Sequence, residues 1–275
     1  MWDALLAYLA QQEDDGWCPP ALPDEPGWER APEYVRRMLR ERRLAKIQQE
    51  EGWLPHPVLL HRLDKDTSGV VALARTERAC RHIVRQFYAH TVVKVYLAVV
   101  RRGSPDWAQP RAPFIAAIDQ ANGGREQLPW PLDLANYQDT PLLLDGPLQR
   151  DPADRRRCVV GTDGQEASTQ IRVLAAAPGD YFLVEARPIT GRTHQIRAHL
   201  AAAGYALVGD TTYAPAPEPD SPEAALARQF LHASSLTLRD YPTDCLRTFI
   251  APLPPDLAEW LRSYFPNFKE RNLCL

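Results

Sequence analysis

The chain has 275 residues, of which 45% are hydrophobic and 24% are charged, and its net charge is −3. This composition is typical of a folded globular protein and excludes a chain that is mainly disordered. No run of about 18 apolar residues occurs, so we expect no membrane span, and the acidic N-terminus predicts neither a signal peptide nor a transit peptide. The five cysteines form no Cys-x-x-Cys pair, which indicates a reduced, cytoplasmic protein without a cysteine-based zinc site.

Charge is distributed unevenly along the chain. Residues 1–27 contain six acidic residues and no Lys or Arg, whereas residues 62–102 contain nine basic and three acidic residues. Most of these basic residues are arginines, whose planar head suits phosphates and stacked bases. The basic segment is compatible with an RNA-binding surface and equally with a set of solvated helix faces, and charge alone does not separate the two.

The first 55 residues are expected to form a helical segment, with helices over 2–11 and 32–51. Clusters of proline predict loops or linkers at residues 19–26, 105–113, 129–147, 215–222 and 252–255. We therefore divide the chain into a helical N-terminal extension, residues 1–55, and a larger domain, residues 56–275.

The larger domain alternates between strand and helix patterns. We expect helices over 77–89, 192–203 and 256–264, and strands over 70–74, 92–100, 168–175, 181–188, 230–238 and 246–250. Strands outnumber helices and several are joined by short turns. The pattern thus predicts an α+β fold with a mixed, largely antiparallel central sheet and flanking helices.

A first polar cluster lies at His61-Arg-Leu-Asp-Lys-Asp-Thr-Ser-Gly69, ahead of an apolar strand. Two carboxylates, two cations, a histidine and two hydroxyls within nine positions are costly to bury unless they pair. Asp, Ser and Gly also favour tight turns. The segment therefore reads either as a functional loop or as an ordinary polar loop before a strand.

Tyr96 lies in the second segment of interest, the strand expected over 92–100. With the two-residue period of a strand, it shares a face with Lys94 and Ala98. This placement leaves room beside the ring, and it also fits a core tyrosine with a satisfied hydroxyl.

A third segment, residues 187–200, contains three arginines and two histidines. On a helix, Arg192 and Arg197 would point about 140° apart, so we expect them to serve different partners. Arg197, on a half-buried helix, needs a carboxylate. His194 and His199 are also five apart, which is wrong for a pair of metal ligands on one face and suits hydrogen-bonded structural histidines.

Together these segments resemble the RluA-type pseudouridine synthases, over roughly residues 56–262. Three departures are expected: no Asn-Lys-Pro-Ala-Gly-like strand precedes the first motif, the small N-terminal RNA-binding domain of some members is absent, and residues 104–146 are longer and richer in proline than usual. The matching motifs are His61–Gly69, Lys94–Ala98, Gly146–Asp151, Gly164–Thr169, Pro188–Leu200, Gly209-Asp210, Tyr213, Phe230–Ala233 and Phe249–Pro252.

The resemblance implies isomerisation of uridine to pseudouridine in structured RNA, in large-subunit rRNA first and tRNA second, by a monomer that needs no cofactor, metal or membrane. It implies that Asp64 is the catalytic carboxylate, that Arg197 pairs with it, and that Tyr96 stacks on uracil and removes a proton. Arg62 would fill the space that the flipped base leaves. Further substrate contacts are expected from His61, Thr67, Arg192 and His194.

Charge alone adds phosphate contacts from Arg36, Arg40 and Arg43. Two other functions remain open at this point. One is a non-catalytic RNA-binding or ribosome-assembly protein on the same scaffold, and the other is a metal-dependent hydrolase that uses Asp64 and His61.

Overall fold

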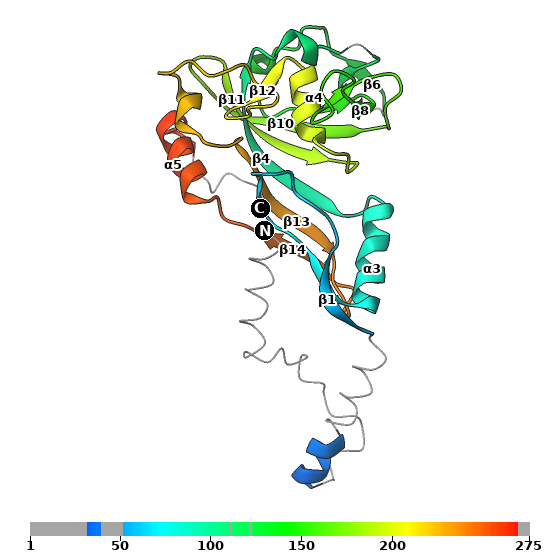
Figure 1. Cartoon of the computed structure of the whole chain (residues 1–275). Helices are drawn as coiled ribbons and strands as arrows, with labels where there is room; N and C mark the ends of the chain where they lie inside the picture. The colour runs from blue at the N-terminus through cyan, green and yellow to red at the C-terminus, as the bar shows by residue number, and fades with distance from the viewer. Residues whose placement is uncertain (1–31, 40–51, 111, 121–122, 269–275) are drawn as a thin grey trace. The chain divides into compact units, whose positions relative to one another are not determined.

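The computed structural model describes residues 32–39, 52–110, 112–120 and 123–268 (Figure 1). The chain divides into two compact units, residues 1–55 with 76–78 and residues 56–75 with 79–275. In the first unit, residues 33–39 form a short helix in which Arg36 pairs with Glu33 at 2.7 Å. The helix expected over 2–11, the rest of the one expected over 32–51, and Arg40 and Arg43 lie outside the described residues.

The larger unit is built on a ten-stranded sheet, as far as the structure describes the chain. Its main path runs β14-β13-β4-β11-β10-β7-β5-β6, with β12 added beside β4 and β2 beside β13. Pairing is antiparallel throughout, except between β2 and β13. The strands are β2 (Ser68–Gly69), β4 (Val93–Arg102), β5 (Ile115–Asp119), β6 (Arg125–Gln127), β7 (Pro141–Asp145), β10 (Ser168–Ala177), β11 (Tyr181–Pro188), β12 (Tyr205–Leu207), β13 (Leu231–Arg239) and β14 (Leu246–Ile250).

Two small sheets and three longer helices complete the described fold. β1 (Trp53–Leu59) pairs with β3 (Leu73–Thr76), and β8 (Leu148–Arg150) pairs with β9 (Cys158–Val160). The helices are α3 (Glu77–Tyr88), α4 (Gln195–Ala202) and α5 (Pro255–Tyr264). The prediction of an α+β fold with a mixed, largely antiparallel sheet and flanking helices is confirmed.

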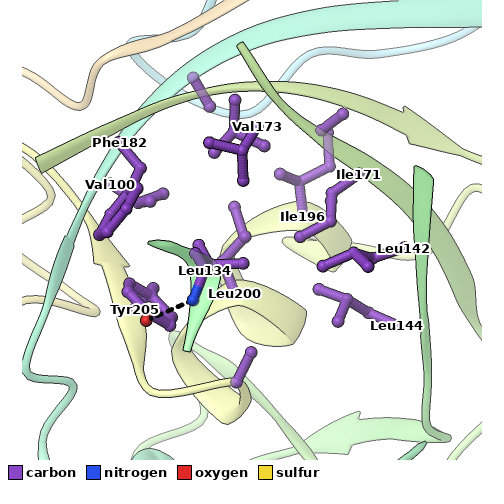
Figure 2. Close-up of a cluster of buried hydrophobic side chains, with 14 of the residues drawn as sticks. Val100, Leu134, Leu142, Leu144, Ile171, Val173, Phe182, Ile196, Leu200 and Tyr205 are labelled. Carbon is purple, nitrogen blue, oxygen red and sulfur yellow. Dashed lines mark hydrogen bonds between the residues drawn. The ribbon is translucent and has the colours of Figure 1, made fainter. Parts of the chain in front are cut away.

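The middle of the central strand β4, residues 97–100, is apolar on both faces, and each face packs against a helix. Ala98 and Val100 belong to a cluster that includes Leu200 of α4, which Figure 2 shows together with Phe182 and Tyr205. Leu97 and Val99 face the other way and join Trp260 and Leu261 of α5. This alternation follows from the two-residue period of a strand, and it leaves the face of Tyr96 on the side of α4.

Several sequence predictions need correction. The strand expected over 70–74 is two short strands, β2 and β3, separated by residues 70–72. The proline-rich stretch 129–147, expected to be a loop, contains β7, because Pro141 occupies the first position of the strand, where its missing N–H is tolerated. β1 also lies directly ahead of the 61–69 motif, where no strand was predicted, and Pro57 inside it weakens the strand pattern.

The helix expected over 192–203 begins three residues later, at Gln195. His194 adopts a left-handed backbone conformation, with φ of 55°, which is incompatible with a continuing right-handed helix. Residues 192–194 therefore form a turn between β11 and α4, and this turn carries Arg192 and His194 to the rim of a cavity.

Candidate active site

A cleft of about 600 Å³ opens where the 61–67 loop, β4 and the turn before α4 meet. Its volume falls within the roughly 300–1,000 Å³ of small-molecule sites. The structure brings almost all of the predicted site residues to this cleft, whereas the side chain of Arg197 lies behind its wall. The predicted residues that line it are His61, Arg62, Asp64, Thr67, Tyr96, Arg192 and His194.

Arg197 joins two carboxylates at the back of the cleft. Its Nε and Nη2 donate hydrogen bonds of 2.7 and 2.8 Å to Asp210, and its Nη1 lies 3.7 Å from Oδ2 of Asp64. The side chain of Asp210 is fully buried, whereas that of Asp64 is 18% exposed and faces the cleft. The expected pairing of Arg197 with Asp64 therefore exists as an ion pair, but the hydrogen-bonded partner of Arg197 is Asp210.

The electrostatic balance at Arg197 favours its charged form. Burial opposes the charge, but the hydrogen bonds to Asp210 and the negative charges of Asp210 and Asp64 outweigh it and raise the pKa of Arg197. The guanidinium also lies over the ring of Tyr213, 4.8 Å from its centre. The Tyr213 hydroxyl is fixed in turn, because it accepts from the Cys158 amide at 2.6 Å and donates to the Cys158 carbonyl at 2.8 Å.

Asp210 and Tyr213 were not predicted as site residues. Asp210 accepts hydrogen bonds from the backbone amides of Thr212 and Tyr213, so a tight turn after β12 fixes its carboxylate. The only sequence signal was the Gly209-Asp210 motif, whose glycine has φ of 73°. A Cβ at that position would lie 2.2 Å from the carbonyl oxygen of Arg228, so the turn requires glycine.

Tyr96 lines the same cleft from β4 and is half-buried. Burial, and then the negative charge of Asp64, raise the pKa of Tyr96 to about 12. The phenol is therefore neutral near pH 7, and Asp64 is close enough to act on it electrostatically. The face assigned to Tyr96 from the strand period, shared with Lys94 and Ala98, agrees with the structure.

The loop that carries Asp64 is held by residues that precede β13. Gln229 Nε2 donates to the Lys65 carbonyl at 2.6 Å and to Thr67 Oγ1 at 3.1 Å. Arg228 donates from Nη1 to the Asp66 carbonyl at 3.0 Å and binds Asp256 of α5 through two hydrogen bonds of 2.7 and 3.0 Å. No sequence pattern pointed to either residue, since the loop residues that they bind lie some 160 positions away.

His61 is part of the cleft wall. Its Nε2 accepts a hydrogen bond from the Ala72 amide at 3.0 Å, and its ring stacks on Phe87 with 5.2 Å between ring centres. Burial, and then the positive charge of Lys94, lower the pKa of His61 to about 4. The histidine is thus neutral near pH 7, with its proton on Nδ1.

The remaining predicted residues differ in how firmly they are held. Arg62 is exposed at the cleft rim, and Arg192 is anchored by a 3.1 Å hydrogen bond to the Glu166 carbonyl. His194 Nδ1 lies 3.3 Å from the Tyr213 hydroxyl, and burial, with the charge of Arg197, lowers the pKa of His194. Arg192 and Arg197 do serve different partners, as expected.

His199 is a hydrogen-bonded structural histidine, as its sequence position suggested. Its Nδ1 lies 2.9 Å from Thr169 Oγ1 and its Nε2 lies 2.9 Å from the Gly146 carbonyl, in the interior of the larger unit. Within the described ranges no group of three or more His, Cys, Asp or Glu side chains could hold a metal ion. No helix in that part of the chain is long and apolar enough to cross a bilayer.

Comparison with known proteins gives a consistent picture. The family model of RNA pseudouridylate synthases matches residues 26–202. An uncharacterized RNA pseudouridine synthase of Chloroflexus aurantiacus is 37% identical over 206 residues, which are 75% of this chain and 53% of that protein. Ribosomal large subunit pseudouridine synthase D of Nitrosomonas europaea is 31% identical over 213 residues, which are 76% of this chain and 52% of that protein. The chain thus spans about half the length of these curated relatives.

The solved structure of human RNA Pseudouridylate Synthase Domain Containing 1 has a similar fold. It aligns with a TM-score of 0.52 and 24% sequence identity, over 79% of this chain and 77% of that one. At this level of identity the likeness concerns the fold, which is the α+β architecture described above.

Proposed function

Because this chain belongs to the RNA pseudouridylate synthase family, we propose that it converts uridine in RNA to pseudouridine, with Asp64 as the catalytic carboxylate. The observation that carries the proposal is the pair formed by Asp64 and Arg197. Asp64 faces the cleft, and its counter-charge is buried behind it, where a second carboxylate fixes the guanidinium. A cation so close stabilises negative charge on Asp64, and a negatively charged oxygen is what the reaction requires.

The reaction is an isomerisation, so its atoms balance without a co-reactant. The bond from the ribose C1′ to the uracil N1 breaks, the base turns, and C1′ bonds to C5, which then loses a proton while N1 gains one. Asp64 either attacks the sugar or takes a proton from it. Both roles need the ionised carboxylate in contact with the nucleoside, and Asp64 is the acidic residue that lines the cleft.

Tyr96 is assigned two tasks in this proposal. Its ring stacks on the uracil, and its hydroxyl oxygen accepts the C5 proton after the new bond forms. With a pKa of about 12 the hydroxyl is protonated near pH 7, so after the C1′–C5 bond forms it gives its proton to N1 of the uracil and accepts the C5 proton in return. The neutral ring meanwhile leaves Asp64 as the negative group beside the sugar.

The target base must leave its helix before it can react, at a cost of a few kcal/mol. Arg62 is exposed at the rim of the cleft, and in this proposal its planar head fills the gap that the flipped base leaves in the RNA stack. Thr67, His61, Arg192 and His194 complete the contacts to the nucleotide. The catalytic domain is proposed to comprise residues 56–275, preceded by an extension over residues 1–55.

The RNA is proposed to be large-subunit rRNA, because several relatives carry that designation, including those of Nitrosomonas europaea and Pasteurella multocida. Transfer RNA is the second candidate. The protein is expected to act as a cytoplasmic monomer without a cofactor.

The test is to incubate the purified chain with total RNA from a strain that lacks its gene and to map pseudouridine at nucleotide resolution. New pseudouridine at a discrete site is expected. If rRNA and tRNA both remain unmodified although the protein binds them, the activity is refuted, and the non-catalytic RNA-binding function takes its place.

A further inference from the structure

Lys94 is a cation in the cleft that the roles assigned above do not use. It lies on β4, two residues before Tyr96 and on the same face, and its side chain lines the cleft. Its Nζ donates one hydrogen bond, of 2.9 Å, to the carbonyl of Thr190 in the turn before α4. An ammonium group has three N–H donors, so two remain for another partner.

No described carboxylate balances the charge of Lys94. Arg197 and Arg228 each have carboxylate partners, whereas no carboxylate among the described residues lies within ion-pair distance of Lys94. Burial lowers the pKa of Lys94 to about 8. Its ionisable neighbour His61 is neutral near pH 7 and would repel Lys94 if it were protonated. A partly buried cation without a counter-charge costs folding free energy, and such a cost is tolerated where a ligand supplies the missing anion.

We propose that Lys94 binds a phosphate group of the RNA strand that delivers the target nucleotide into the cleft. The proposal rests on the function proposed above and adds a residue to its substrate-binding set. Lysine binds phosphate as a point charge, and the ammonium is held by the Thr190 carbonyl at the wall of the cleft that Tyr96 and Arg192 also line. A phosphate there completes the hydrogen bonds of Nζ while the base stacks on Tyr96.

A structural role makes the opposite predictions. If Lys94 only supports the turn through Thr190, its loss should destabilise the protein and leave the salt dependence of RNA binding unchanged. If Lys94 is a phosphate ligand, Lys94→Met should keep or raise the melting temperature, because an uncompensated charge disappears, and should weaken RNA binding.

The experiment measures the affinity of the full chain for an in vitro transcript of large-subunit rRNA between 50 and 300 mM salt. We compare wild type with Lys94→Gln, which keeps a donor for Thr190, and with Lys94→Arg, which keeps the charge. Arg262→Gln is the matched control, because Arg262 is exposed on α5 and donates a hydrogen bond to the Ala258 carbonyl of its own helix. We expect Lys94→Gln to bind about tenfold more weakly, as for the loss of one charged hydrogen bond.

The slope of log affinity against log salt should become shallower by about 0.7–0.9 in Lys94→Gln, which is the contribution of one phosphate contact. Lys94→Arg should recover most of both effects, and Arg262→Gln should match wild type. An unchanged salt slope in Lys94→Gln overturns the proposal, whether or not the affinity falls. A lower affinity with an unchanged slope would mean that Lys94 contacts an uncharged atom of the RNA and not a phosphate. The binding experiment does not require catalysis. If Lys94→Gln shows the slope change but the wild-type protein makes no pseudouridine, the proposed activity is refuted while the phosphate contact of Lys94 stands.

Discussion

Arg197 Nη1 lies 3.7 Å from Oδ2 of Asp64, in the cleft, while the same guanidinium donates two short hydrogen bonds to Asp210 behind it. Asp210 thus fixes the orientation of the guanidinium. Asp64 interacts with the positive charge of Arg197 but accepts neither of its two short hydrogen bonds. This arrangement leaves the oxygens of Asp64 accessible to a substrate, which a bidentate pair between Arg197 and Asp64 would not.

The first prediction concerns the buried partner of Arg197. Asp210→Ala leaves the guanidinium without its hydrogen-bonded carboxylate, and removing one partner of a buried pair costs about 3–5 kcal/mol. Urea denaturation should show this loss in the free energy of unfolding. Asp119→Ala, which breaks the pair with Arg125 in which both side chains are exposed, is the control and should leave the midpoint nearly unchanged. Equal stability of Asp210→Ala and wild type would contradict the arrangement.

A second prediction concerns the loop that carries Asp64. Gln229→Ala removes the hydrogen bonds to Lys65 and Thr67. Because these bonds position Asp64 and do not touch the substrate, kcat should fall about tenfold while the affinity for RNA stays near that of wild type. Single-turnover assays and binding titrations separate the two quantities. A variant that loses affinity and keeps kcat would place Gln229 at the RNA surface instead.

The hydroxyl of Tyr96 can be tested apart from its ring. Tyr96→Phe keeps the stacking surface, so RNA affinity should change little, while turnover should fall by about 10²–10⁴ if the oxygen accepts the C5 proton. Tyr96→Ala should lose affinity as well. Turnover of Tyr96→Phe at the wild-type rate would show that the ring alone suffices.

Acidification should destabilise the fold through His61 and His199, whose pKa values burial lowers to about 4. In the unfolded chain these histidines take up protons near pH 6.5, so between pH 6.5 and 4 the unfolded state binds more protons than the folded state. The free energy of unfolding should therefore fall with falling pH, by up to about 1.4 kcal/mol per pH unit for each histidine. Urea titrations at pH 7, 6 and 5 measure the slope, which His61→Gln should reduce; an identical slope in that variant would refute the assignment.

Local sequence patterns predicted the parts of the fold that local physics determines. The β10–β11 hairpin follows from two apolar strands around Gly179, which has φ of 85°, and α5 follows from its amphipathic pattern. The start of α4 and the strand β7 were not predicted correctly. His194 ends the helical pattern early through a left-handed backbone that no side-chain periodicity reveals, and β7 was hidden by Pro141 within a proline-rich stretch.

The site was predicted where its residues lie in recognisable motifs and missed where they act from a distance. Asp64, Tyr96 and Arg197 come together as the resemblance implied, and Lys94 was already placed on the face of Tyr96. The residues that hold them were not foreseen, because the contacts of Asp210 and Gln229 form only when distant segments meet.

The most direct measurement is the pseudouridine content of target RNA after incubation with Asp64→Asn. The substitution keeps the size of the side chain and removes its charge, so the variant should fold and bind RNA like wild type while forming no pseudouridine. Melting temperature and RNA affinity serve as the controls. Pseudouridine formation at the wild-type rate by a folded Asp64→Asn protein would contradict the central claim that the ionised Asp64 beside Arg197 performs the reaction.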